Sequence, residues 1–457
     1  MNDPKVQEQG RCNARETGVS GRLLSFALFL YLALYLLIPY KPWHYPISFH
    51  TPVLGFGLLL MAIQVFTCPG LWKKYLKTDM LLFSLMFLFF MVSALLVHSR
   101  EFSMDGLRIY LVSFLCFLFV RTAVAGLDLE SAFKWINYYL IAAGALILLQ
   151  INSYRGFVVA GIFGYPCNEG ATAGWGFANG PTLGGGILAW LLTVSLVRYL
   201  FSVAAKKTHF AGLIHLAAIA FGAAGLFFTF NRSAWLGISC VMLVLVYAYI
   251  SEGLPKKRLF MLVMVIVASV LLLKVFTHPM IDNRQTKESF FIKFLQKPAA
   301  TVTADPSANT RATIWRYTLG LINNAPAWGV GVDNFPRLYN KAYPELLAKA
   351  NGVIDANRNI TPHNSYLYYT AELGGIPAFF LFLLVGWVLF KGFRSGYYCD
   401  AFPFWAGLLA VCIWAATNDY MRERIFWIVL GVVSGLTHLR PRNTAGKTEG
   451  LNKPMPL

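Results

Sequence analysis

The chain has 457 residues, of which 57% are hydrophobic and 13% are charged. Because soluble proteins carry about 25% charged residues, a soluble fold, a fibrous chain and a disordered chain are all excluded. Apolar helices satisfy their own backbone hydrogen bonds and can therefore span a membrane. We expect an all-α polytopic membrane protein.

The formal net charge of +18 reflects an excess of Lys and Arg over Asp and Glu. In a soluble protein such an excess would raise the question of nucleic-acid binding. Short cytoplasmic loops of membrane proteins collect Lys and Arg for topological reasons alone. We therefore expect membrane lipid, and no nucleic acid, among the partners.

Apolar runs long enough to cross a bilayer recur along the whole chain. They predict about 12 transmembrane helices, near residues 22–40, 51–67, 79–97, 106–125, 133–150, 182–200, 210–229, 233–251, 259–277, 366–390, 403–418 and 424–439. The seventh and eighth runs are separated by Asn231 and Arg232, which mark a hairpin turn between them.

The basic residues indicate the orientation of these runs. Lys and Arg number 21 on the side of the N-terminal tail and seven in the short loops opposite, which places both termini in the cytoplasm. No cleavage site follows the first run, so we expect it to remain as an anchor. The expected organisation is a cytoplasmic tail at 1–21, transmembrane helices 1–9 at 22–277, a large periplasmic loop at 278–365, transmembrane helices 10–12 at 366–439 and a cytoplasmic tail at 440–457.

The loop at 278–365 is where we expect the site chemistry, because loops longer than about 15 residues are uncommon unless they are functional. Its segments TRATIWRYTLGLI and YPELLAKA predict amphipathic helices, and GVGVDNF between them predicts a Gly-rich turn. The apolar runs hold no Asp or Glu near a midpoint. That pattern disfavours a proton-driven pump, although it leaves a passive channel or facilitator open.

Three arginines on the predicted outer face are candidates for binding a diphosphate, because a guanidinium matches two phosphate oxygens at once. Arg232 lies between two very apolar runs and has no acidic neighbour in sequence. Arg311 and Arg316 would point in directions about 140° apart on a helix. We expect Arg311 to contact the ligand, since it shares a face with Trp315, and Arg316 to have a supporting role. A solvated or headgroup-contacting charge is the alternative for each arginine.

His363 follows Thr361 and Pro362, which resemble an N-cap and a first helical position. We therefore expect His363 to begin a helix that runs toward Leu373. The positive end of a helix disfavours the imidazolium form, and a neutral imidazole could act as a general base on a sugar hydroxyl. A capping or hydrogen-bonding histidine is the alternative.

We expect neither a metal nor another cofactor. The only acidic pair with Asp-x-Asp-like spacing is Asp128-x-Glu130, which the topology places on the cytoplasmic side. The acidic residues of the outer loop are scattered without the spacing of metal ligands.

The segment HNSYLYYTAELGG resembles the signature of the O-antigen ligase family, which is shared with O-antigen polymerases and bacterial O-oligosaccharyltransferases. His363, Asn364 and Gly374 fit that signature, whereas Pro377 departs from its last position. The segments FANGPTLGGGILAWLL, FNRSAWL and TRATIW…PAWGVGVDNF resemble further family blocks and stand in the expected order.

The resemblance implies a GT-C-like membrane glycosyltransferase of the bacterial inner membrane. In the ligase branch, an enzyme of lipopolysaccharide biosynthesis, the donor is a glycan linked to undecaprenyl diphosphate and the acceptor is lipid A–core on the periplasmic face. By resemblance, Arg232 and Arg311 contact the diphosphate with support from Arg316, and His363 activates the acceptor by a metal-independent, inverting displacement. Supporting roles fall to the block residues Asn364, Asp333 and Tyr366.

Three alternatives stay open at this point. O-oligosaccharyltransferases usually add a soluble periplasmic region after the last span, which the short predicted tail does not suggest. O-antigen polymerases share the general layout and are the second candidate. A non-enzymatic lipid or glycan transporter, from a different functional class, would explain the spans but not the histidine segment.

Overall fold

The computed structural model describes residues 19–37, 50–67, 77–97, 104–152, 176–177, 181–201, 209–229, 231–251, 253, 259–260, 262–263, 306–349, 361–395, 399–419, 421 and 423–437. Regular structure within these residues is entirely helical. The prediction of an all-α chain is therefore confirmed for the described part.

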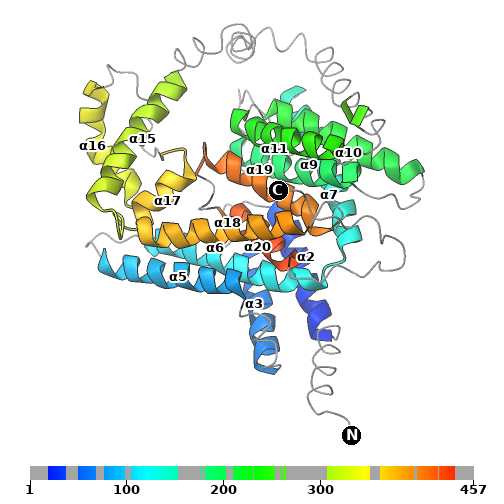
Figure 1. The fold of residues 1–457 in the computed structure, drawn as a ribbon, viewed down its shortest axis with the longest axis horizontal. Coiled ribbons are helices and arrows are strands. Elements are labelled where there is room, and N and C mark those ends of the chain that lie inside the picture. Colours follow the sequence, from blue (N-terminus) through cyan, green and yellow to red (C-terminus); the bar gives the residue numbers. More distant parts are fainter. Residues whose placement is uncertain are drawn as a thin grey trace.

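The helices before residue 278 are α2 (Val19–Leu37), α3 (His50–Thr67), α5 (Thr78–Leu96), α6 (Met104–Ala123), α7 (Leu129–Asn152), α9 (Pro181–Phe201), α10 (His209–Phe228) and α11 (Arg232–Ser251). They are followed by α15 (Pro306–Asn324), α16 (Phe335–Lys349), α17 (Ser365–Leu373), α18 (Gly375–Arg394), α19 (Ala401–Ala415) and α20 (Arg424–Leu436). Figure 1 shows α15 and α16 at one side of the bundle and α2 and α3 at the other, with α6 and α20 between them.

Six of these helices are long and apolar enough to cross a membrane: 78–96, 106–126, 129–150, 182–201, 232–251 and 375–394. Five further apolar helices are shorter, at 22–37, 50–64, 212–228, 401–415 and 424–436. Helices occupy every expected apolar run except 259–277, most of which lies outside the described residues. This arrangement supports a polytopic membrane protein, and the number of spans stays a prediction.

The bundle has two ends that can be told apart by their polar residues. Gly237 of α11 packs on the backbone of Ala410 in α19, whereas Tyr249 at the far end of α11 contacts Phe201 of α9 edge-to-face. The starts of α9 and α11 therefore lie together with the end of α19, at what we call the His363 end. At the opposite end, the Arg198 end, Arg198 of α9 forms ion pairs with Glu130 of α7 and Asp400 beside α19.

The expected apolar span at 366–390 is wrong, because the structure divides it into α17 and α18 at Gly374. Gly374 has a φ of +90°, and a Cβ there would lie 2.3 Å from the carbonyl oxygen of Ala327. Only glycine accommodates this backbone and this contact. The transmembrane helix therefore begins at Gly375, and α17 is a separate short helix.

Arg121 is one of the 21 basic residues counted on the side of the N-terminal tail, but it is buried within the bundle and is not a loop cation. Its Nε donates to Asp79 Oδ2 at 2.5 Å and its Nη2 donates to Asp79 Oδ1 at 3.1 Å. Ser434 of α20 donates to the same carboxylate, and Arg121 and Asp79 are both buried. A bidentate pair of this kind joins α5, α6 and α20 near the Arg198 end.

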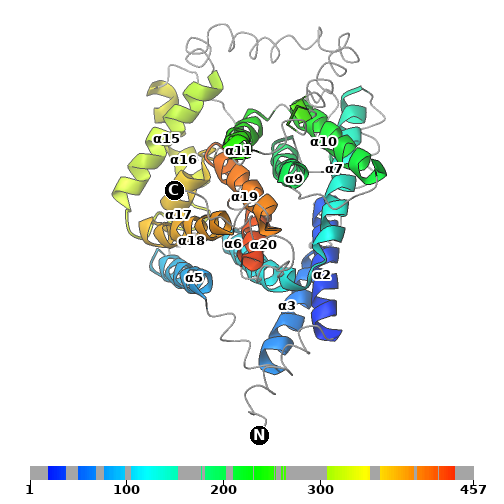
Figure 2. The same ribbon diagram turned by 45° about the vertical axis from the view of Figure 1, so that its right-hand side comes forward.

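The two helices predicted in the outer loop are confirmed as α15 and α16, with the Gly-rich turn between them (Figure 2). Residues 278–305 and 350–360 of that loop lie outside the described residues. A small hydrophobic core joins α15 and α16 to α17, and its buried members are Ile314, Phe335, Tyr339, Tyr368 and Ala371. The helices that carry Arg311 and His363 therefore form one packed unit.

This unit is fastened to the bundle by main-chain hydrogen bonds at the α17–α18 break. The N–H groups of Val330 and Gly331 donate to the carbonyls of Ala371 and Glu372, at 2.8 and 3.0 Å. The N–H groups of Gly375 and Ile376 donate in turn to the carbonyls of Pro326 and Ala327, at 2.7 and 3.3 Å. The buried Glu372 carboxylate adds a 2.8 Å hydrogen bond from the Tyr110 hydroxyl of α6.

Candidate active site

The start of α17 differs from the expectation drawn from Thr361 and Pro362. Asn364, and not Thr361, is the N-cap, since its side chain accepts a 3.1 Å hydrogen bond from the N–H of Leu367. His363 therefore precedes the helix, and its φ of +48° lies in the left-handed region that non-glycine residues seldom adopt. Such backbone strain persists only when the surrounding structure enforces it.

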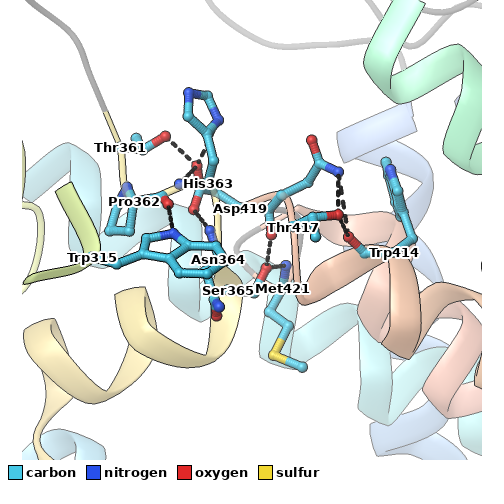
Figure 3. Close-up of polar contacts among 11 residues, drawn as sticks. Trp315, Thr361, Pro362, His363, Asn364, Ser365, Trp414, Thr417, Asp419 and Met421 are labelled. Atoms are coloured by element: carbon cyan, nitrogen blue, oxygen red, sulfur yellow. Dashed lines mark hydrogen bonds and ion pairs between the residues drawn. The ribbon is translucent and has the colours of Figure 1, made fainter. Parts of the chain in front are cut away.

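Asp419, in the loop after α19, enforces the His363 conformation (Figure 3). Its carboxylate accepts hydrogen bonds from the backbone N–H groups of His363 and Asn364, both at 3.0 Å, and from the Thr361 hydroxyl. His363 Nδ1 lies 3.6 Å from Asp419 Oδ2. One carboxylate thus holds the turn before α17 and faces the imidazole ring.

The loop that carries Asp419 is itself fixed to α17 and α20. The N–H of Ser365 donates to the carbonyl of Asn418 at 3.0 Å, and the N–H of Met421 donates to Ser365 Oγ at 3.1 Å. The carbonyl of Met421 accepts from Trp427 Nε1 at 2.7 Å and from the Tyr369 hydroxyl at 3.3 Å. Asp419 therefore has a defined position relative to His363.

Helix α15 reaches the same turn through Trp315, whose Nε1 donates to the carbonyl of Pro362 at 2.7 Å. Arg311 lies one helical turn before Trp315, on the same face, and interacts electrostatically with His363. Arg316 is exposed and is not brought to His363. The expectation that Arg311 and Arg316 point in different directions agrees with these positions.

Burial is the main influence on the charge state of His363. Burial lowers the pKa of the imidazole below its ordinary value of 6.5, Asp419 opposes this shift, and Arg311 adds to it. Burial also raises the pKa of the Asp419 carboxyl, against the effects of His363, Thr361 and the backbone N–H groups. The His363 side chain is still 45% exposed, so a neutral imidazole faces outward at neutral pH and can accept a proton.

Arg232 is the first residue of α11, at the His363 end of the bundle. The preceding Asn231 donates to the carbonyl of Thr182 at 2.8 Å and accepts from the N–H of Ala234 at 3.2 Å. These bonds fix the hairpin that the sequence predicted between the two apolar helices. Arg232 itself is exposed, and it shares this end of the bundle with His363.

The residues expected to have supporting roles fall in different places. Asn364 caps α17, and the Tyr366 hydroxyl donates to the carbonyl of Cys412 at 2.9 Å, which ties α17 to α19. Asp333 lies against Gly106 with a φ of +60°, in the turn bonded to the far end of α17. The structure therefore separates Asp333 from His363 by the length of that helix.

Sequence reasoning missed Asp419, whose carboxylate accepts hydrogen bonds from Thr361, His363 and Asn364. A signal was present, since Asp419 is an acidic residue that follows the expected apolar run at 403–418, in a short loop that entered the sequence argument only through the count of basic residues. No group of three or more His, Cys, Asp or Glu side chains that could hold a metal ion occurs in the described ranges.

A comparison with known protein families shows which family this chain resembles. Residues 217–383 match the family model described as O-antigen ligase. The O-antigen ligase resemblance is thus confirmed over a segment that includes Arg232, Arg311, Arg316 and His363 but ends before Asp419. A comparison with curated proteins finds no match. The O-antigen ligase match supports membrane glycosyltransferase activity of the ligase or polymerase type.

Proposed function

We propose that this protein is an O-antigen ligase, which transfers O-antigen glycan from undecaprenyl diphosphate to lipid A–core oligosaccharide on the periplasmic face of the bacterial inner membrane. The family match over residues 217–383 supports the type of activity. The observation that carries the mechanism is the contact of the His363 ring with Asp419, together with the electrostatic interaction of His363 with Arg311.

In the proposed reaction, His363 is the general base. The acceptor hydroxyl gives its proton to the imidazole while its oxygen forms a bond to the anomeric carbon of the donor. The bond from that carbon to the diphosphate oxygen breaks, and its electron pair leaves with undecaprenyl diphosphate. Displacement from the opposite face inverts the anomeric configuration.

Arg311 is proposed to stabilise the negative charge that develops on the leaving diphosphate. Its position near His363 supports this role, because a fixed guanidinium in a partly dehydrated site stabilises charge without reorganisation. Arg232 contacts the same diphosphate in this proposal, from the start of α11. The exposed Arg316 has a secondary role, and no metal ion takes part.

Asp419 is a positioning residue in this mechanism. Because its carboxylate faces Nδ1, it orients the imidazole and favours the tautomer in which Nε2 is free to accept the acceptor's proton. It also stabilises the imidazolium that forms during transfer. Asn364 and Tyr366 keep α17 in place beneath the histidine.

An O-antigen polymerase is the second candidate, since the family match is equally compatible with polymerase-type activity. The two differ in the acceptor, which for a polymerase is another lipid-linked glycan. A lipid or glycan transporter is the candidate from a different class, and it would move glycan across the membrane without making a glycosidic bond.

Reconstitution separates these candidates. The purified protein in proteoliposomes is supplied with an undecaprenyl-diphosphate glycan and with rough lipopolysaccharide, and the products are resolved on gels. A ladder of capped lipopolysaccharide supports the ligase, and longer lipid-linked chains support the polymerase. Glycan flux with no new linkage would identify a transporter and contradict the proposal.

A further inference from the structure

The peptide bond between Pro362 and His363 is held at both of its polar ends. Its carbonyl oxygen accepts the 2.7 Å hydrogen bond from Trp315 Nε1 of α15, and its N–H donates to Asp419 Oδ2 at 3.0 Å. A trans peptide is planar, and its C=O and N–H point in opposite directions. Trp315 and Asp419 therefore hold this peptide from opposite sides (Figure 3).

The orientation of this peptide decides where the His363 side chain points. Once the peptide plane is fixed, the direction of the side chain depends on the φ of His363, which is +48°. A non-glycine residue keeps such a φ only when its surroundings enforce it. Asp419 holds the N–H end of the peptide, which could still tilt about that single bond, and the bond from Trp315 to the carbonyl end prevents the tilt.

Trp315 also has a fixed relation to Arg311. The two residues are four positions apart on the continuous helix α15, so they share a face and are separated by about 6 Å along the helix axis. Arg311 is close enough to His363 to act on its charge. Because one helix carries both side chains, a shift of α15 at Trp315 also moves the guanidinium relative to the imidazole.

The bond from Trp315 is a directional contact between α15 and the turn before α17. The core under α15 is apolar, with Ile314 packed among residues that include Tyr368 and Ala371 of α17. Apolar packing is non-directional, so it holds the helices together without specifying which atoms meet. A hydrogen bond depends on distance and angle, and this one sets the register of α15 on the turn.

We propose that Trp315 is a positioning residue of the active site, whose indole N–H sets the separation between the Arg311 guanidinium and the His363 imidazole. This role deepens the proposed function and rests on it. The diphosphate leaves beside Arg311 while His363 takes the acceptor proton, so both groups must be aligned with one anomeric carbon. A misplacement of about 1 Å in such an arrangement can cost about 10²-fold in rate.

The charge state of His363 reports this separation without any catalysis. Burial lowers the pKa of His363, Asp419 raises it from the loop after α19, and Arg311 lowers it from α15. These are the charged groups that act on the imidazole within the described residues. If the bond from Trp315 is lost and Arg311 moves away, the pKa of His363 should rise. This direction is opposite to the one expected when Asp419 is replaced.

Chemical modification measures that pKa in the full-length protein in nanodiscs. Diethyl pyrocarbonate reacts with neutral imidazole, and the His363 side chain is 45% exposed, so its modification rate against pH, mapped by peptide mass spectrometry, gives a midpoint. Trp315→Phe keeps an aromatic ring without the N–H, and its midpoint should move to higher pH. Trp315→Gln places an amide nitrogen as many bonds from Cα as the indole nitrogen and should stay near the wild type. Trp315→Met, similar in length to Gln but without a donor, should behave as Trp315→Phe does.

Trp405→Phe is the matched control. Trp405 Nε1 donates to the carbonyl of Leu389 at 2.8 Å, which is the same kind of bond, between α19 and α18 toward the Arg198 end of the bundle. Its loss should leave the His363 midpoint unchanged. A midpoint in Trp315→Phe and Trp315→Met equal to that of the wild type would overturn the proposal. So would a Trp315→Gln midpoint shifted as far as that of Trp315→Met, because packing and not the hydrogen bond would then be responsible.

The Arg311→Gln background separates the proposed cause from a general loosening of the turn. Without the guanidinium, Trp315→Phe has no charge to displace and should raise the His363 midpoint no further. A further rise as large as in the wild-type background would mean that the imidazole has only become more exposed to water. That result would also overturn the proposal.

The transfer assay tests the consequence for the reaction. Trp315→Phe should lower kcat at least about tenfold and leave KM for the donor nearly unchanged, because Arg311 is still present to bind the diphosphate. A raised donor KM with an unchanged kcat would make Trp315 a donor-binding residue and overturn the positioning role. If the midpoints move as expected but the wild type makes no glycosidic bond, the proposed function fails and the control of the Arg311–His363 separation stands. If the wild type transfers glycan and the midpoints do not move, the function stands and the role of Trp315 fails.

Discussion

Asp419 contacts His363 through the main chain and faces its ring as well. The carboxylate accepts the backbone N–H of His363 at 3.0 Å, and the same oxygen lies 3.6 Å from Nδ1. A single side chain, from a loop that is far away in sequence, thus holds the His363 backbone in its left-handed conformation and also orients the ring.

The pH dependence of transfer should reveal this contact. His363 acts as a base only when neutral, so the rate should rise with pH through the pKa of His363, which burial lowers below 6.5. Asp419 raises that pKa, so in Asp419→Asn the acidic limb should move to lower pH, and the plateau rate should fall by at least about tenfold. Initial rates between pH 4.5 and 8.5 measure both effects. A lower rate with an unmoved limb would mean that Asp419 is only structural.

His363→Asn should remove the base while retaining the turn. Asparagine tolerates positive φ better than most residues, so the hydrogen bonds from residues 363 and 364 to Asp419 should persist. Loss of a general base typically lowers the rate by about 10²- to 10⁴-fold. Transfer assays paired with thermal unfolding should show an inactive protein of unchanged stability. An active His363→Asn protein would rule out the base assignment.

The three arginines should differ in their sensitivity to replacement by lysine, which keeps the charge but loses the bidentate fork. Arg311→Lys and Arg232→Lys should lower kcat/KM by at least about tenfold, or about 1.4 kcal/mol. Arg316→Lys should have a smaller effect because Arg316 is exposed and away from His363. Steady-state kinetics with varied donor measure the series. Near-wild-type values for all three variants would identify them as topological charges.

Asp79→Ala should destabilise the bundle without touching the site. It leaves the buried Arg121 without its carboxylate, and breaking such a pair costs about 3–5 kcal/mol. Thermal unfolding in detergent should show a clear loss, and Asp79→Ala combined with Arg121→Met should recover much of it. If the single variant is as stable as the wild type, the pair does not contribute to folding.

The topology itself can be tested by thiol labelling in a background without other cysteines. Asn340 is exposed on α16, so Asn340→Cys should react with an impermeant maleimide in intact spheroplasts. The native Cys399 lies beside Asp400 at the Arg198 end and should react only after the membrane is permeabilised. The reverse pattern would place the His363 end in the cytoplasm and contradict the proposed function.

Sequence reasoning succeeded where the structure depends on local pattern. Apolar length located the helices, and the amphipathic spacing around Trp315 gave the face of α15 on which Arg311 lies. The Gly-rich turn between α15 and α16 was evident from composition.

Sequence reasoning failed where contacts between segments far apart in sequence decide the structure. The apolar run expected at 366–390 contains Gly374, Gly375 and Pro377, which signal a helix break. The span assignment passed over that signal, and the contact of Gly374 with Ala327 in another segment decides where the break falls. Thr361 and Pro362 have the residue types of a helix start, but the Thr361 hydroxyl is bonded to Asp419 and Asn364 caps the helix instead. Arg121 was read as a loop charge because nothing near it in sequence reveals Asp79 as its partner.

The hydrogen bonds that hold α15 and α16 at the α17–α18 break affect which substitutions the protein can accept there. Its hydrogen bonds join backbone atoms of residues 326–331 to those of residues 371–376, so most side chains there can be exchanged without removing a bond. Larger side chains at the glycines are not tolerated, because a Cβ at Gly329 or Gly374 would lie within 2.5 Å of the facing backbone. This joint should therefore tolerate changes of polarity and reject added atoms, whereas the His363 turn should accept changes of size more readily than the loss of a single carboxylate.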